Sequence, residues 1–256
     1  MHLAYMNHPA RAILDEARWA ADNGFDALDL TIEGPAALID SFDPAELRAL
    51  LDAAGMRVVG HTAWYLPFAS PVERVRRAAV EEVAASLPVF AALGASMVNV
   101  HITRGVPLYG NDDELQRNGA SFAELAHLAE PYSIQIIVEH PPWRRFGLQQ
   151  IRAILDADPR LGLHLDVGHA FVAGIDLEQL LGELGDRLRH VHFSDNRGQD
   201  DDHMPIGAGK IDWQQTIRLL KRAGYDGIVT LEVFDQERDF LLLSAQKVRS
   251  WWATLE

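Results

Sequence analysis

The chain has 256 residues, 48% of them hydrophobic, which is enough to bury the core of one (β/α)8 barrel of roughly 250 residues. Its formal net charge of −14 argues against a surface that grips a nucleic-acid backbone. The absence of cysteine excludes disulfides and thiolate metal sites, so a bound metal would need His, Asp or Glu ligands.

Short apolar runs alternate with longer segments of helical spacing along the chain. The runs with strand character are residues 3–7, 27–31, 57–62, 97–102, 134–140, 161–167, 188–194 and 228–234. The segments with helical spacing are residues 13–21, 44–54, 72–93, 114–129, 148–157, 177–184, 213–223 and 240–251. Asp43 and Ser70 each precede a proline at a predicted helix start. Glycines fall where helices should end, at Gly24, Gly55, Gly94 and Gly224.

Eight strand–helix units predict a single-domain (β/α)8 TIM barrel over residues 1–256. Their strands are nearly continuous apolar runs, as in parallel sheets buried on both faces. A doubly wound open sheet is the alternative, but it usually has fewer strands and a glycine-rich first turn, which this sequence lacks. Residues 196–203 are predicted to form a long loop after the seventh strand, and such loops are often functional.

The N-terminal sequence, the lengths of the apolar runs and the cysteine content indicate the subcellular location. The N-terminus lacks the basic start and apolar stretch of a signal peptide. No apolar run approaches the about 20 residues that a membrane span needs. A cysteine-free chain fits a reducing compartment. We therefore expect a cytoplasmic protein that has no membrane partner.

Side chains able to bind a metal follow the predicted strands at their C-terminal ends. In a barrel these ends meet at one rim, where barrel enzymes build their sites. One His or Glu there would more often be a hydrogen-bonding rim residue, and Asp166 with His169 could simply cap a following helix. Their coincidence on six consecutive strands favours a shared site, since burying them uncompensated is costly. The residues are His61, His101, Glu139, Asp166, His169, His192 and Glu232, with Asp201 and His203 in the loop.

Strand seven offers two histidines, His190 and His192, which share a face because side chains alternate along a strand. His192 lies nearer the rim and is the better candidate ligand. We expect His140, His164 and His190 to support the site or to fill space beside it.

Several motifs resemble those of the xylose isomerase-like, or endonuclease IV-like, barrels. The resemblance spans nearly the whole chain. The family includes sugar and sugar-phosphate isomerases and epimerases, inosose-processing enzymes and the DNA-repair endonuclease IV. The motifs that carry the resemblance are LDVGH at 165–169, HVHFSD at 190–195, HMPIGAG at 203–209 followed by IDW at 211–213, and LEV at 231–233.

The isomerase branch of this resemblance implies one divalent cation, Mn, Mg, Zn or Co, held by Glu139, Asp166, His192 and Glu232. It also implies that His169 and Arg197 contact the substrate. Glu139 and Glu232 would then remove and return a carbon-bound proton through an enediolate that the metal stabilises. The resulting prediction is a metal-dependent isomerase or epimerase that acts on a sugar, a sugar phosphate or a small keto-polyol.

An aromatic and apolar segment follows His61, and it suits closure over a small ligand. We expect Trp64 and Phe68 to line the mouth of the site and Trp64 to contact the substrate.

Two other activities are alternatives within the same resemblance. The endonuclease branch implies up to three zinc ions and cleavage of DNA at abasic sites. Its further ligands would be His61, His101, His169, Asp201 and His203. The negative charge and the compact chain disfavour this activity. An inosose-type dehydratase is the other alternative, and a non-catalytic metal- or sugar-binding barrel is disfavoured by the two opposed glutamates.

Overall fold

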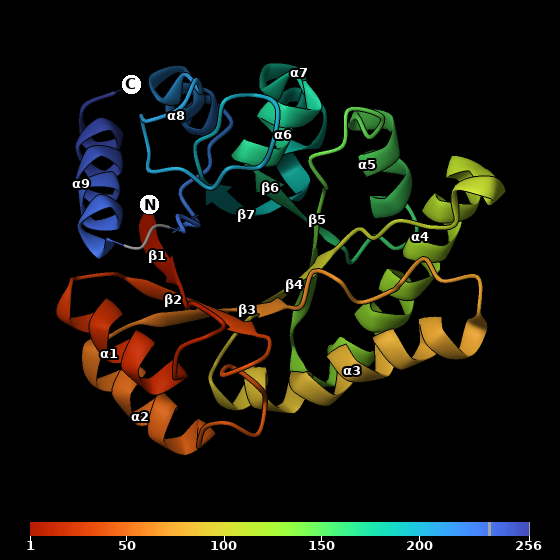
Figure 1. Cartoon of the computed structure of the whole chain (residues 1–256), viewed down its shortest axis with the longest axis horizontal. Helices are drawn as coiled ribbons and strands as arrows, with labels where there is room; N and C mark the ends of the chain where they lie inside the picture. Colours follow the sequence, from red (N-terminus) through yellow and green to blue (C-terminus); the bar gives the residue numbers. More distant parts are fainter. Residues whose placement is uncertain (235–236, 256) are drawn as a thin grey trace.

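The computed structural model describes residues 1–234 and 237–255, which form a closed barrel of parallel strands (Figure 1). Each strand pairs with the next, and β8 closes on β1 in register from His2 opposite Ile228 to Tyr5 opposite Leu231. This architecture confirms the predicted (β/α)8 fold. The strands are β1 (His2–Met6), β2 (Ala27–Ile32), β3 (Arg57–Thr62), β4 (Met97–His101), β5 (Gln135–Glu139), β6 (Gly162–Asp166), β7 (Leu188–Phe193) and β8 (Ile228–Leu231).

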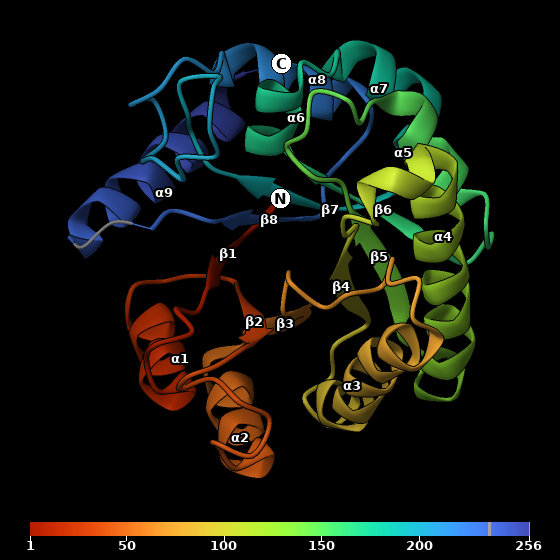
Figure 2. The same cartoon turned by 45° about the vertical axis from the view of Figure 1, so that its right-hand side comes forward.

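Helices surround the barrel on its outside (Figure 2). They are α1 (Ile13–Asp22), α2 (Pro44–Ala54), α3 (Glu73–Ala92), α4 (Gly110–Ala129), α5 (Leu148–Leu155), α6 (Val167–Ala173), α7 (Leu177–Leu184), α8 (Trp213–Arg222) and α9 (Arg238–Thr254), with short 3-10 turns at Pro107–Tyr109, Glu130–Tyr132 and Gly185–Arg187. No helix within the described part of the chain is long and apolar enough to cross a bilayer.

Most local signals in the sequence act as predicted. Asp43 caps α2 by accepting from the Ala45 amide at 2.8 Å, and the four predicted glycine stops all have positive φ. The prediction for Ser70 was wrong. Its hydroxyl accepts from the Val72 amide in a turn, and α3 begins only at Glu73. Helix α6 is an addition to the predicted list, capped by Asp166, which thus combines capping with its place at the rim.

The barrel interior is apolar only at its lower end. A small cluster there consists of Ala4, Ala27, Val59, Ile137 and Ile228. Because alternate residues of a strand face the same side, the inward positions above it lie two and four residues further along. Two residues further along, four of these strands carry Asp29, His61, Glu139 and Thr230 where branched aliphatics usually fill a barrel. The substituted upper layers place the polar side chains under the C-terminal rim.

Candidate metal centre and substrate cavity

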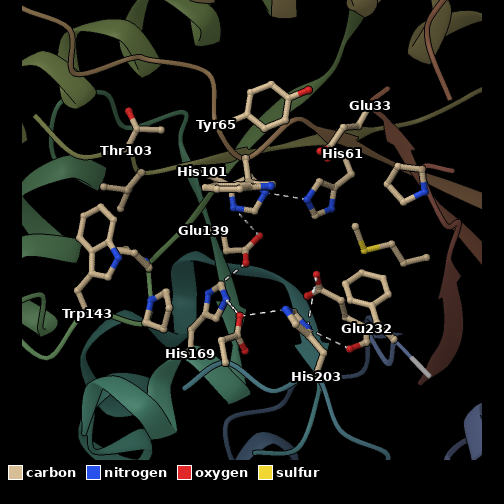
Figure 3. A pocket seen from close by; sticks show the side chains of 18 of the residues that line it. Glu33, His61, Tyr65, His101, Thr103, Glu139, Trp143, His169, His203 and Glu232 are labelled. Carbon is tan, nitrogen blue, oxygen red and sulfur yellow. Dashed lines mark hydrogen bonds and ion pairs between the residues drawn. The ribbon is translucent and has the colours of Figure 1, made fainter. Parts of the chain in front are cut away.

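A cavity of about 810 Å³ opens at the C-terminal rim of the barrel (Figure 3). Its floor carries Glu139 and Glu232, and its walls include Trp64, Trp143 and Phe234. Polar side chains from separate strands and loops converge on this space: Glu33, His61, His101, His169, Asp201 and His203. The cavity therefore lies where the strand-end pattern placed a site.

Four buried side chains at the cavity floor form one group of potential metal ligands. Glu139 ends β5, Asp166 ends β6, His192 lies in β7 and Glu232 follows β8. One donor atom from each lies within 4.8 Å of the other three. Three carboxylates this close repel one another when buried, so the arrangement calls for positive charge between them. The predicted four-residue set is thus brought together in space.

Asp166 shows the need for such a charge most directly. Its Oδ1 accepts from the His169 amide at 2.6 Å, but its Oδ2 is buried and has no hydrogen-bond partner among the described residues. Burial, together with the nearby Glu232, Asp201 and Glu139, raises the pKa of Asp166 to about 7. An unpartnered carboxylate oxygen aimed into a group of ligands is a position that a cation would fill.

A fourth buried carboxylate, Asp29 of β2, orients the imidazole of the group. Its Oδ2 lies 2.8 Å from Nε2 of His192, so Nδ1 of that ring faces the rim, 2.9 Å from Glu232 Oε2 and 3.9 Å from Asp166 Oδ2. Metal-binding histidines usually donate their other ring N–H to a carboxylate in this way. Although burial opposes it, Asp29 and Glu232 hold the pKa of His192 well above its usual range.

Glu139 is held from several sides. The Asn99 amide donates to its Oε2 at 2.6 Å, and His101 Nδ1 and His164 Nδ1 lie 3.4 and 3.2 Å from the same oxygen. His169 Nδ1 lies 3.3 Å from Oε1. Burial alone would raise the pKa of Glu139, but the neighbouring histidines lower it below its usual value. The carboxylate is therefore ionised and fixed in orientation.

Glu232 lies on the other side of the cavity floor. Burial opposes its ionisation, but His203 and His192 lower its pKa to about 2. His203 and His169 both reach Oδ2 of Asp201, at 3.0 and 2.9 Å, and form one chain of contacts across the rim (Figure 3). The backbone of His203 has φ of 47°, a left-handed conformation that non-glycine residues rarely adopt. Such strain is common where a loop positions a functional side chain.

His61 and His101 form a further group with Glu139. Their Nε2 atoms lie 2.8 Å apart, and one donor from each residue comes within 4.8 Å of the others. Burial lowers the pKa of His101 to about 4, whereas Asp29 raises that of His61. Seven of the nine predicted ligand-type residues therefore line a single cavity, and the other two, Asp166 and His192, are grouped with Glu139 and Glu232 of its lining.

The donors fit a divalent cation. Three carboxylates and one imidazole are the ligand types that Mg, Mn, Co and Zn share in proteins. Asp166 Oδ2 has no hydrogen-bond partner that would compete with a cation, and Asp29 holds the His192 ring in a fixed orientation.

The remaining predicted residues are placed as follows. Trp64 lines the cavity mouth and is 64% exposed. The prediction for Phe68 was wrong, because its ring is fully buried and packs edge-on against Phe122 of α4, 5.3 Å between centroids. Arg197 is exposed and lies outside the cavity lining, whereas Arg104 lines it and stacks on Trp143 at 4.6 Å.

Sequence reasoning missed Asp29 and Asn99 as parts of the site. Asp29 is completely buried, and its two oxygens contact His61, His190, His192 and Thr230. The available signal was a charged residue flanked by Leu28 and Leu30 in a strand that buries both faces, because an uncompensated charge there is very costly.

The model of the xylose isomerase-like TIM barrel family matches residues 17–253. Inosose dehydratase of Lacticaseibacillus casei is 25% identical over 226 residues, which cover 74% of this chain and 73% of that protein. Fructoselysine 3-epimerase of Escherichia coli O157:H7 is 23% identical over 229 residues, 84% of this chain and 83% of the relative. The crystal structure of a D-tagatose 3-epimerase-like protein has a TM-score of 0.88 at 26% identity and covers 99% of this chain and 97% of that one.

Proposed function

This chain belongs to the xylose isomerase-like TIM barrel family, and on that premise we propose that it is a divalent-metal-dependent sugar epimerase or isomerase. Its relatives include an inosose dehydratase and a fructoselysine 3-epimerase, and these names support an enzyme that acts on a small sugar or polyol. The observation that carries the proposal is the pair of buried glutamates, Glu139 and Glu232, that meet at one cavity floor from β5 and from the end of β8.

Glu139, Asp166, His192 and Glu232 would hold the cation. When bound, it would supply Lewis-acid polarisation of a substrate carbonyl and the adjacent hydroxyl.

The two glutamates perform the proton transfer. One carboxylate accepts the proton from the carbon beside the carbonyl, and the other returns a proton to the opposite face or to the neighbouring carbon. Asn99 and His169 fix the orientation of Glu139, and His203 lies beside Glu232 Oε1 at 3.8 Å. Fixed orientation matters because proton transfer needs hydrogen-bond reach to the reacting carbon.

The cavity walls suit a sugar or keto-polyol. His61, His101, His169 and His203 can donate to or accept from hydroxyl groups. Trp64, Trp143 and Phe234 offer apolar faces to the C–H side of a ring or chain.

Incorporation of solvent deuterium into the product tests the proposed proton transfer. Incubation with a panel of ketoses in D2O should give an epimer or isomer that carries deuterium at the reacting carbon, because the accepting carboxylate exchanges with solvent. Removing metal with a chelator should lower the rate at least about a hundredfold, since Lewis-acid stabilisation contributes several kcal/mol. NMR of the product and elemental analysis of the protein provide the measurements.

Restoration by Mn²⁺ or Co²⁺ is the control for damage by the chelator. Undiminished turnover by fully metal-free protein would contradict the proposal. A product that has lost one water, without an epimer, would identify a dehydratase like the Lacticaseibacillus casei relative.

Abasic-site endonuclease activity is the second candidate, favoured by the additional ligand-type residues His61, His101, His169, Asp201 and His203 around the same cavity. We predict that the zinc-loaded protein does not nick abasic duplex DNA beyond a chelated control, because its net charge of −14 repels the backbone. Gel electrophoresis of a labelled duplex measures this. Zinc-dependent cleavage at the abasic position would reverse the order of the two candidates.

A further inference from the structure

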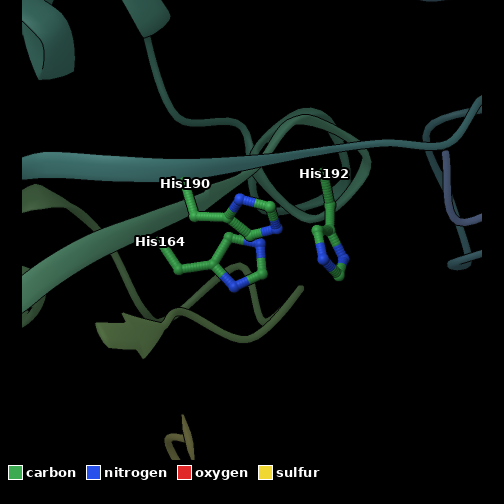
Figure 4. Close-up of side chains that lie close together, drawn as sticks. All are labelled: His164, His190 and His192. Atoms are coloured by element: carbon green, nitrogen blue, oxygen red, sulfur yellow. The ribbon is translucent and has the colours of Figure 1, made fainter. Parts of the chain in front are cut away.

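A second polar layer lies inside the barrel directly below the rim ligands. On β6, β7 and β8 it consists of His164, His190 and Thr230, each two residues before a rim ligand and hence on the same inward face. Asp29 joins them from β2, and all four side chains are completely buried. Figure 4 shows His164 and His190 side by side, with His192 next to them. None of these residues below His192 has a role in the proton transfer proposed above.

The imidazoles of this layer are incompletely satisfied. Both ring nitrogens of His164 and Nδ1 of His190 have no hydrogen-bond partner in the part of the chain that the structure describes. His164 Nδ1 lies 3.2 Å from Glu139 Oε2, but in an orientation that makes no hydrogen bond. Each buried polar group left unpaired destabilises the folded state, because its hydrogen bonds to water are lost and not replaced. An aliphatic residue at these positions would avoid this penalty. The unpaired nitrogens therefore indicate that a bound species interacts with this layer.

The nitrogens converge on one point. His164, His190 and His192 each offer one nitrogen, and these atoms lie within 4.8 Å of one another. The ring centroid of His164 is 4.1 Å from that of His192 and 4.8 Å from that of His190. Three convergent imidazoles are a common ligand set for zinc and other transition metals.

Asp29 completes the arrangement as a supporting carboxylate. Its Oδ2 lies 2.9 Å from His190 Nε2, whereas Nδ1 of the same ring has no hydrogen-bond partner among the described residues. The same oxygen accepts from the Thr230 hydroxyl at 2.7 Å and faces His192 Nε2 at 2.8 Å. A carboxylate behind a ligating histidine fixes the tautomer and increases the basicity of the ring.

We propose that His164, His190 and His192 form a second, buried site for a divalent transition metal that prefers imidazole, such as Zn²⁺, Ni²⁺ or Cu²⁺, with Asp29 as its counter-charge. The three nitrogen donors disfavour Mg²⁺ and Ca²⁺, which prefer oxygen. His192 is the side chain shared with the rim group, and its Nδ1 faces the rim while Nε2 faces Asp29. Filling both sites at once would require His192 to bind as an imidazolate, with the loss of every proton that its ring nitrogens carry.

Metal stoichiometry of matched variants tests the proposal. The protein is loaded with Zn²⁺, freed of excess by gel filtration and analysed for zinc per chain. His190→Gln keeps an N–H able to reach Asp29 but removes the imidazole, and His164→Leu removes an imidazole without leaving an unpaired polar group. Each should bind one ion fewer than the unaltered protein. His140→Leu, which removes a buried imidazole outside the cluster, should keep the full number.

The rim site is tested separately by Asp166→Asn, which should lose the rim ion and keep the deep one. Failure of the rim site, and with it of the proposed function, is thereby distinguished from failure of this inference. Equal zinc content in His164→Leu, His190→Gln and the unaltered protein overturns the deep site.

If the interior variants do not fold, anomalous diffraction from crystals of the unaltered zinc-loaded protein decides the matter. A peak at the zinc edge between the three imidazoles supports the site. A water molecule or empty density at that position overturns it.

Discussion

Glu139→Gln is expected to lower kcat by about 10²–10⁴-fold, because the variant loses a positioned proton acceptor. The amide retains the size of the side chain and its place in β5, so we expect sugar binding to weaken far less than turnover. The measurement is kcat at saturating substrate and saturating metal, with metal content checked on the same samples. Exchange of the substrate C–H with D2O should fall in parallel.

Glu114→Gln is the matched control. Glu114 is also a buried glutamate, but it pairs with Arg145 at 3.0 Å and does not line the cavity. This variant should keep most of its turnover. If Glu139→Gln turned over within tenfold of the unaltered protein at full metal occupancy, Glu139 would not be the proton acceptor.

Asp29→Asn is expected to weaken metal binding at the rim by about 10–100-fold, the usual effect of losing the carboxylate behind a ligating histidine. Asparagine preserves the shape of the side chain but replaces one carboxylate oxygen by an NH2 group and removes the charge, so His192 loses the charged acceptor that fixes its orientation. Competition with a fluorescent chelator measures the Kd for Zn²⁺ or Co²⁺. Because the side chain is completely buried, a direct contact with substrate does not enter the comparison.

Asp226→Asn removes an exposed carboxylate at the lower end of the barrel and serves as the control. It should leave the metal affinity unchanged. Unaltered affinity in Asp29→Asn would show that His192 is oriented by other contacts. A thermal unfolding scan of each variant separates loss of metal from loss of the fold.

The convergence of the strand-end residues was predictable from the geometry of the barrel alone. Parallel strands joined by helices place all C-terminal ends at the same rim. Once eight units are recognised, Glu139, Asp166, His192 and Glu232 need no further information to be brought together. The end of β8 was less predictable. The strand ends at Leu231, and Glu232 is held just beyond it because its amide donates to Phe193 O at 3.1 Å.

Residues in loops and in strand interiors were less predictable. Phe68 and Trp64 lie in one apolar segment, yet Phe68 packs against α4 and Trp64 faces the cavity mouth. The difference depends on where α4 passes, which no local pattern encodes. Arg197 follows strand seven in sequence, but the loop turns it to solvent while Asp201 and His203 reach the cavity.

By itself, the sequence determined the number of strand–helix units, the rim on which the polar side chains meet and the chemical character of those side chains. These follow from the periodicity of apolar residues and from ligand types, which are local properties. Only the tertiary structure decided that Asp29, from the second strand, reaches His61 and His192 across the barrel, at 3.3 and 2.8 Å. It also decided that His164 and His190 stand as a separate layer below the rim. Both depend on the stagger of closed strands, which sets the heights at which inward side chains from distant parts of the chain meet.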